Sequence, residues 1–184
     1  MKKQRILICG TPGTGKSSTF EKIRETNPDD FDFISIVELC KKKKIVKKHE
    51  VEIKKLEKIL TKEIQKMKKT VILEGHLGCE LKNAFDAIII LRADPKILEK
   101  RLSKRKYSSQ KILDNLVSEM LDYCTIESEK NNPKANVIEI RSDKNSIEKI
   151  SQKIVKMIKL KKFKGERVSF KLEKYRNYIS RDVL

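Results

Sequence analysis

The sequence has few of the residues that build disulfide frameworks, zinc sites and aromatic cores. Its 184 residues include no tryptophan, two histidines and four cysteines, and aromatic residues make up 5% of the chain. The cysteines stand far apart and form no C-x-x-C pair: Cys9, Cys40, Cys79 and Cys124. We therefore expect reduced thiols in packing positions, with neither a disulfide framework nor a Cys/His zinc site.

Long apolar runs are also missing, which bears on where the protein works. No segment approaches the roughly 20 apolar residues of a membrane-spanning helix. The first ten residues, MKKQRILICG, are too short to hold the apolar region of a secretory signal. We expect a soluble protein with no membrane partner, located in the cytoplasm, or also in the nucleus of a eukaryote. Nothing in the sequence sets the oligomeric state, and a monomer is favoured.

Negative charge is scarce relative to positive charge. Lysine and arginine number 44 against 26 acidic residues, which gives a net charge of +18. Such a charge favours polyanionic partners such as nucleotides, RNA or an anionic membrane surface. Lysine-rich helices with solvated faces would produce the same composition, so charge alone leaves the partner open.

Five short apolar segments alternate along the chain with segments of helical periodicity. We expect strands at residues 5–9, 31–36, 70–74, 85–91 and 136–140. Helices are expected up to about residue 25 and at 52–67, 93–102, 109–130 and 146–159, with a lysine-rich helical segment after the second strand. This alternation predicts a three-layer α/β domain with a five-stranded parallel sheet between helices, at about residues 1–160.

Residues 161–184 differ in character from the rest. They are basic and weakly periodic, and they carry aromatic residues among the lysines: Phe163, Phe170, Tyr175 and Tyr178. Aromatic side chains among lysines suit RNA or a ribosomal protein. The alternative is a tail that folds onto its own domain.

The segment GTPGTGKS, residues 10–17, matches the pattern G-x4-G-K-[ST] and lies between an expected strand and an expected helix. Its glycines let backbone N–H groups approach phosphates at a helix N-terminus. Lys16 is expected to bridge the outer phosphates of ATP, Ser17 to bind Mg²⁺, and Ser18 to contact the α-phosphate. The sequence therefore predicts a P-loop protein.

A P-loop indicates triphosphate binding without specifying the reaction. The sequence has no N-K-x-D motif of the kind that reads guanine in GTPases, and it is too short for most motor ATPases. Kinases of small acceptors need arginines in a short mobile lid. EKRLSKRKYSS, residues 99–109, provides Arg101 at the end of a helix that faces the site, and Arg105 as the lid or transition-state arginine. A solvated basic helix end is the alternative.

The segments ICGTPGTGKSS, VILEGHLGC and IIILRADPKILEKRLSKRKY, with the LDN that follows, resemble the adenylate kinase 6 family. These are small P-loop proteins of archaea and eukaryotes, described as adenylate kinases or ATPases and linked to small ribosomal subunit maturation. The match runs from residue 4 to about residue 158. The resemblance implies conversion of ATP and AMP to two ADP, intrinsic ATPase activity, Mg²⁺ as cofactor, and a small-subunit ribosomal protein and pre-rRNA as partners.

The resemblance also implies roles for individual residues. ATP contacts fall on Gly13, Gly15, Lys16, Ser17, Ser18, Arg105 and, on the adenine side, Lys144. Glu74 takes the place of a Walker B acid and His76 that of a catalytic histidine. The acceptor-binding segment spans about residues 33–53, with Glu38 and Lys41 as contacts, and the lid spans about 104–114.

The sequence departs from the family pattern at two of these positions. Glu74 stands where aspartate is more usual, and Lys41 stands where eukaryotic members commonly have arginine. Lysine lacks the bidentate fork with which arginine grips a phosphate. Two alternatives therefore stay open: a ribosome-assembly ATPase with little AMP kinase activity, and a P-loop kinase of another small acceptor.

The segment EGHLGC, residues 74–79, follows the apolar run Val71–Leu73. If this strand and the P-loop strand end at the same sheet edge, Glu74 is placed to hold the magnesium shell through water. His76 has an ordinary pKa near neutrality and is suited to orient or deprotonate a water molecule. A polar turn whose histidine bonds to the backbone is the alternative.

Overall fold

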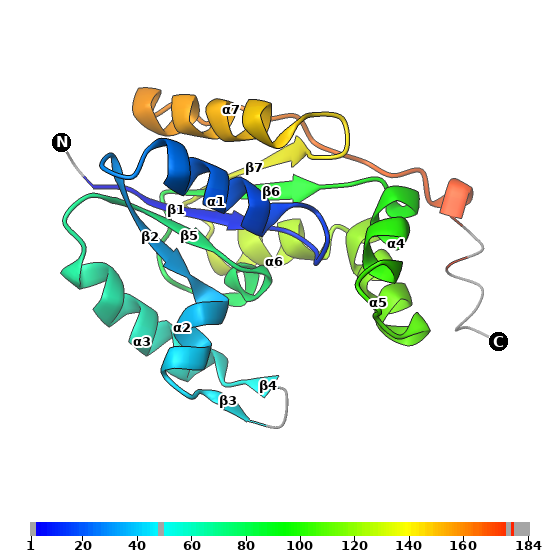
Figure 1. Cartoon of the computed structure of the whole chain (residues 1–184), viewed down its shortest axis with the longest axis horizontal. Helices are drawn as coiled ribbons and strands as arrows, with labels where there is room; N and C mark the ends of the chain where they lie inside the picture. Colours follow the sequence, from blue (N-terminus) through cyan, green and yellow to red (C-terminus); the bar gives the residue numbers. More distant parts are fainter. Residues whose placement is uncertain (1–2, 48–49, 176–177, 179–184) are drawn as a thin grey trace.

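A computed structural model describes residues 3–47, 50–175 and 178. The chain forms a five-stranded sheet in the order β2-β5-β1-β6-β7, and every neighbouring pair is parallel. The strands are β1 (Arg5–Cys9), β2 (Phe31–Ser35), β5 (Thr70–Glu74), β6 (Ala87–Arg92) and β7 (Asn136–Arg141). The predicted α/β fold with five parallel strands is confirmed (Figure 1).

Helices cover both faces of the sheet (Figure 1). The alternation of side chains along β1 explains this arrangement. Ile6 and Ile8 belong to the core beneath α1 (Lys16–Thr26) and α7 (Ile147–Leu160). Leu7 and Cys9 point to the opposite core, beneath α3 (Ile53–Lys66) and α6 (Tyr123–Asn131). Strands buried on both faces read as continuous apolar runs, as the central strands here do.

The carboxyl end of the sheet carries the remaining elements. A helical arm is formed by α4 (Pro95–Ser103) and α5 (Ser109–Met120), and the short helix α2 (Ile36–Lys42) follows β2. The 3₁₀ helix η1 (His76–Glu80) follows β5. Because all five strands are parallel, their carboxyl ends meet at one edge, where α/β proteins bind ligands.

The residues at the N-terminus of α4 explain why the helix begins there. The Asp94 side chain accepts a hydrogen bond from the Lys96 N–H at 2.9 Å, and Pro95 occupies the first turn. Pro suits that position because its missing N–H would have no partner within the helix. The Asp94 cap and Pro95 therefore fix the residue at which the helical arm begins.

The single helix predicted at residues 109–130 is wrong, because the chain forms two helices there. The break is at Asp122, which has a left-handed φ of 55° and lies between α5 and α6. Aspartate tolerates this conformation better than most residues. Its carboxylate also pairs with Arg92 at 2.5 Å, a tertiary contact that helical periodicity does not reveal.

The lysine-rich segment after β2, which begins with α2, also differs from the prediction. Its helix ends at Lys42, Lys44 has a left-handed φ of 51°, and a hairpin follows. This hairpin pairs β3 (Val46–Lys47) with β4 (Glu50–Val51) in antiparallel fashion. The acceptor-binding segment predicted from the sequence is therefore a short helix followed by a hairpin.

The described part of the tail packs onto the domain. Val168, Phe170 and Tyr175 are buried in a cluster with Leu98 and Leu116 of the helical arm. Tyr175, the last residue of η2 (Leu172–Tyr175), also donates from Oη to Asp94 Oδ2 at 3.0 Å. Within the described ranges, no helix has both the length and the apolar character needed to cross a membrane.

Candidate nucleotide-binding site

The P-loop joins β1 to α1 in a form that only glycine adopts readily. Gly13 and Gly15 have φ values of 94° and 95°. A Cβ atom on Gly13 would lie 2.7 Å from Leu98 Cδ1 of α4, so a larger residue would also displace the helical arm. Because its N-cap is Gly15, helix α1 has no side-chain cap. Its first N–H groups are therefore available to an anion.

Lys16 is the first residue of α1 and is 7% exposed. Its Nζ atom donates to the Thr11 carbonyl at 3.0 Å, which holds the ammonium against the inside of the loop. An ammonium has three donors, so this contact leaves others to point at a phosphate. The lysine is thus fixed where the sequence pattern requires it.

Ser17 and Glu74 bring two kinds of oxygen together. Ser17 Oγ donates to Glu74 Oε1 at 3.1 Å. Glu74 is 5% exposed, and burial raises its pKa, while the charge of Lys16 and the Ser17 hydroxyl oppose that rise. Hydroxyl and carboxylate oxygens are the ligands that Mg²⁺ prefers, usually with waters retained. The donor set therefore fits a magnesium ion.

His76 stands at the start of η1, two residues after Glu74. Its side chain is exposed at the mouth of the site, yet the protein atoms around its ring and the charge of Lys16 lower its pKa. The imidazole is therefore largely neutral near pH 7, as a proton acceptor must be. Its backbone carbonyl accepts hydrogen bonds from the thiols of Cys9 at 3.3 Å and Cys79 at 3.1 Å, which fix the turn.

The helical arm closes the other side of the site. Arg101 Nη1 donates to the Gly13 carbonyl at 3.1 Å, so α4 is tied directly to the P-loop. After a turn at residues 104–106, Arg105 and Tyr107 face the same cavity as the P-loop. The ammonium of Lys111 lies 4.4 Å from the centroid of the Tyr107 ring. The predicted lid is thus a turn followed by the start of α5.

These residues line one cavity of about 380 Å³, called here the phosphate pocket. It is lined by Pro12, Gly13, Gly15, Lys16, Ser17, Ser18, Val37, Glu74, His76, Arg105, Tyr107, Lys111 and Asn115. Eight of the residues predicted from the sequence are therefore in one place. Lys144 is exposed in the loop after β7 and does not line this pocket, so its adenine contact stays a prediction.

A second cavity of about 490 Å³, called here the apolar pocket, adjoins the first. It is lined by Ile36, Val37, Cys40, Lys41, Val51, Ile53, Gly75, His76, Leu77 and Glu80. Val37 and His76 line both pockets. Lys41 is the one lysine or arginine in this lining within the described residues. Glu38 is exposed and lines neither pocket, so its acceptor contact stays a prediction.

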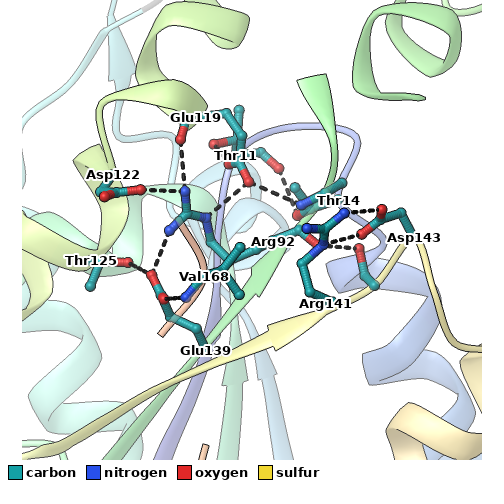
Figure 2. Close-up of polar contacts among 12 residues, drawn as sticks. Thr11, Thr14, Arg92, Glu119, Asp122, Thr125, Glu139, Arg141, Asp143 and Val168 are labelled. Atoms are coloured by element: carbon teal, nitrogen blue, oxygen red, sulfur yellow. Dashed lines mark hydrogen bonds and ion pairs between the residues drawn. The ribbon is translucent and has the colours of Figure 1, made fainter. Parts of the chain in front are cut away.

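Sequence reasoning missed a buried ion network behind the P-loop. Arg92, at the end of β6, pairs with Glu119 at 2.9 Å and with Glu139 at 2.5 Å. Glu119 in turn accepts a hydrogen bond from Thr11 Oγ1 of the P-loop, and Glu139 accepts one from the N–H of Val168 in the tail. Figure 2 shows these contacts as one cluster that joins the P-loop, the arm and the tail.

A signal for this network was present in the sequence. Arg92 ends an apolar strand whose residues are all buried, and Glu119 stands between Leu116 and Met120 on the apolar side of α5. A charged residue in an apolar pattern indicates a buried partner of opposite charge. The pattern does not say which acid and which base meet.

All four cysteines are free and buried, as predicted, but three of them lie together, which the sequence did not indicate. The Sγ atoms of Cys9, Cys79 and Cys124 all lie within 4.8 Å of one another. Cys9 ends β1, Cys79 lies in η1 and Cys124 lies in α6. The fold brings them together across large sequence separations, which a search for C-x-x-C pairs does not detect.

Known proteins resemble this chain in sequence and in fold. The family model described as "AAA domain" matches residues 6–122. A Methanocaldococcus jannaschii protein named "Putative adenylate kinase" is 36% identical over 186 residues, covering 97% of this chain and 99% of the relative. A protein of the same name from Methanococcus maripaludis is 35% identical over 165 residues, covering 85% of this chain and 89% of the relative.

Among solved structures, shikimate kinase from Acinetobacter baumannii in complex with shikimate has a TM-score of 0.61. The match covers 89% of this chain and 97% of the kinase. At 18% sequence identity, this similarity shows the fold and does not identify the acceptor.

Proposed function

The chain belongs to the AAA domain family and to the same family as these archaeal relatives, and on that basis we propose that it is an ATP-dependent nucleoside monophosphate kinase. The proposed reaction converts ATP and AMP to two ADP, with slower hydrolysis of ATP when water replaces the acceptor. Membership of the adenylate kinase 6 branch, with a role in small ribosomal subunit maturation, is the finer form of this proposal.

The main support for this proposal is that the two pockets adjoin each other. The phosphate pocket holds Lys16, Ser17, Glu74 and Arg105, while the apolar pocket opens beside it at His76. Phosphoryl transfer requires the acceptor to lie in line with the leaving phosphate, in a space that excludes bulk water. A donor in the phosphate pocket and an acceptor in the apolar pocket would meet at the position that both pockets share.

The residues of the phosphate pocket have complementary tasks. The N–H groups at the start of α1 and the ammonium of Lys16 bind the outer phosphates. Ser17 and Glu74 would hold Mg²⁺, which neutralises phosphate charge when bound. Arg105 approaches from the lid to neutralise charge that develops during transfer. Arg101 acts indirectly, because its contact with Gly13 sets the position of the lid.

A second candidate, an assembly ATPase acting on a ribonucleoprotein, is favoured by the sparse charge of the apolar pocket. Lys41 offers a point charge where a monophosphate is held best by a bidentate arginine. The net charge of +18 suits RNA. The tail gives less support than its sequence indicates, because Phe170 and Tyr175 are buried against the domain and not available for base stacking.

One assay separates the two candidates. The full chain is incubated with Mg-ATP, and ADP and phosphate are measured with and without AMP, then with small-subunit components or RNA. ADP formation that depends on AMP supports the kinase. Phosphate release that rises with ribosomal components, without a response to AMP, supports the assembly ATPase. ADP formation driven by another small hydroxyl compound instead of AMP would indicate a different acceptor.

We expect Lys41→Arg to improve the use of AMP. A guanidinium in the same position gains a bidentate contact with the monophosphate, so KM for AMP should fall about fivefold with KM for ATP unchanged. The matched control is Lys42→Arg, because Lys42 is exposed on the same helix and lines neither pocket. Equal effects of the two substitutions would show that Lys41 does not face the acceptor.

We expect His76→Ala to reduce ATP hydrolysis about 100-fold, the lower range for a general base, while the Kd for ATP changes less than about threefold. The lowered pKa of His76 keeps the imidazole neutral near pH 7. Protonation should remove the base, so the hydrolysis rate of the wild type should fall at acidic pH, at a point below the ordinary histidine pKa of about 6.5. The variant should lack this acidic limb. Equal losses in affinity and turnover would count against a water-activating role.

A further inference from the structure

Three cysteines from three separate elements converge beneath the turn that carries His76. The Sγ atoms of Cys9, Cys79 and Cys124 lie within 4.8 Å of one another. Their exposed fractions are 0%, 1% and 7%, so the cluster is inside the protein. The fourth cysteine, Cys40, is also buried but belongs to α2 and lies outside the cluster. The mechanism proposed above uses none of these thiols.

The dimensions of the cluster fit a single metal ion. A metal–sulfur bond of about 2.3 Å places three sulfur atoms of a trigonal site about 4 Å apart, within the observed limit of 4.8 Å. Across the described residues, no histidine nitrogen or carboxylate oxygen joins this group as a fourth ligand. The site therefore consists of three soft sulfur donors.

The three cysteines are free thiols in the protein, and Cys9 and Cys79 donate S–H hydrogen bonds to the His76 carbonyl at 3.3 Å and 3.1 Å. Thiol ligands lose their protons when a metal ion binds, so binding at this cluster should strengthen as the pH rises.

We propose that Cys9, Cys79 and Cys124 form a buried trigonal site for a soft monovalent metal ion, of which Cu(I) is the type. Thiolates select soft ions. Zinc takes four ligands in structural sites, and with three protein ligands it adds water, which this buried position disfavours. Binding of one Cu(I) replaces the three thiol protons, so three metal–sulfur bonds form and three protons leave to solvent.

Occupancy of this site would also affect the nucleotide pocket. The thiols of Cys9 and Cys79 hydrogen-bond to the carbonyl of His76, and metal binding removes both donors. Cys9 also directly precedes Gly10 of the P-loop. The His76 turn should therefore shift, and ATP turnover should fall. This consequence rests on the proposed function, whereas metal binding itself does not.

The test is an anaerobic titration of the reduced full chain with Cu(I) in competition with a chromogenic Cu(I) chelator. The wild type should bind one equivalent and show thiolate-to-metal charge-transfer absorption in the ultraviolet. Cys79→Ser and Cys124→Ser should each weaken binding more than about 100-fold, beyond the effect of losing an outer-shell partner. The matched control, Cys40→Ser, should bind like the wild type. Thermal melting identifies any variant that has failed to fold. If one cluster variant does not fold, the Cu(I) affinity of the other cluster variant tests the proposal.

Three results would overturn the proposal. The first is a wild type that leaves all Cu(I) with the chelator. The second is a Cys40→Ser variant that loses as much affinity as the cluster variants. The third is binding of Zn(II) in preference to Cu(I), with a Co(II) spectrum typical of four-coordinate sites. Loss of ATP turnover on metal addition is measured separately, so an inactive wild type would refute the proposed function and leave the binding result intact.

Discussion

Lys16→Ala is expected to abolish ATP-dependent ADP formation and phosphate release, with kcat at least about 1,000-fold below that of the wild type. One preorganised donor in an active site is worth about 100- to 1,000-fold, and Lys16 adds a full charge in a buried position. Its Nζ atom is held by the Thr11 carbonyl at 3.0 Å and faces the phosphate pocket. No other lysine comes from the P-loop to replace it.

The loss should be catalytic and not structural. The Lys16 side chain makes one hydrogen bond in the folded protein, and a single bond with a charged partner contributes about 1.5–3 kcal/mol to the free energy of unfolding, too little to unfold the domain. The measurement is single-turnover ADP formation at saturating Mg-ATP, together with a thermal melt. The matched control is Lys22→Ala on the same helix, since Lys22 forms only a partly exposed ion pair with Glu25. Normal turnover in Lys16→Ala would refute the assignment of the site.

Much of the site was predictable because of how its residues are distributed along the chain. Five of the predicted contacts lie between residues 13 and 18, where spacing alone fixes their positions. Glu74 and His76 follow a strand that runs parallel to β1, so both strands end at the same sheet edge. Arg105 follows the helix that packs on the P-loop. In each case a local pattern and the parallel topology were sufficient.

Contacts between distant segments were not predictable in this way. The break at Asp122 depends on Arg92, which is 30 residues away in the sequence. The cysteine cluster depends on the meeting of three elements that periodicity treats separately. The tail was ambiguous because its aromatic residues suit both RNA and a protein core. Tertiary packing determines these features. The local sequence pattern around a residue does not indicate which distant segment that residue will contact.

Arg92 is the residue where these distant contacts meet, and it carries the second large prediction. Its guanidinium pairs with Glu119, Glu139 and Asp122, and it lies 5.1 Å from the centroid of the Phe170 ring. Asp122 is partly exposed, whereas Glu119 and Glu139 are buried. The free-energy cost of burying these two carboxylates is offset mainly by the single positive charge of Arg92. Removing one member of such a network leaves the remaining buried charges without a partner.

We expect Arg92→Leu to lower the free energy of unfolding by about 3–5 kcal/mol, the usual cost of breaking a buried ion pair from one side. For a chain of this length, that corresponds to a fall in Tm of about 6–20 °C. The matched control is Arg167→Leu, because Arg167 also ties the tail to the domain, but through an ion pair with Glu129 in which both side chains are exposed. That change should cost about 1 kcal/mol or less.

The pH dependence of the free energy of unfolding distinguishes a buried charge left without a partner from a loss of packing. Burial already raises the pKa of Glu119 in the wild type, and loss of Arg92 should raise it further. A carboxyl with a raised pKa in the folded state favours folding while both states are protonated, and this contribution is lost as the pH rises through the folded pKa. The deficit of Arg92→Leu should therefore be largest near pH 7, should narrow as the pH falls through the raised folded pKa of Glu119, and should be smallest below the ordinary glutamate pKa of about 4.3. Adding Glu119→Gln and Glu139→Gln to the variant should recover part of the stability at pH 7. A deficit that is independent of pH, or no larger than that of Arg167→Leu, would mean that packing and not charge holds the P-loop, the arm and the tail together.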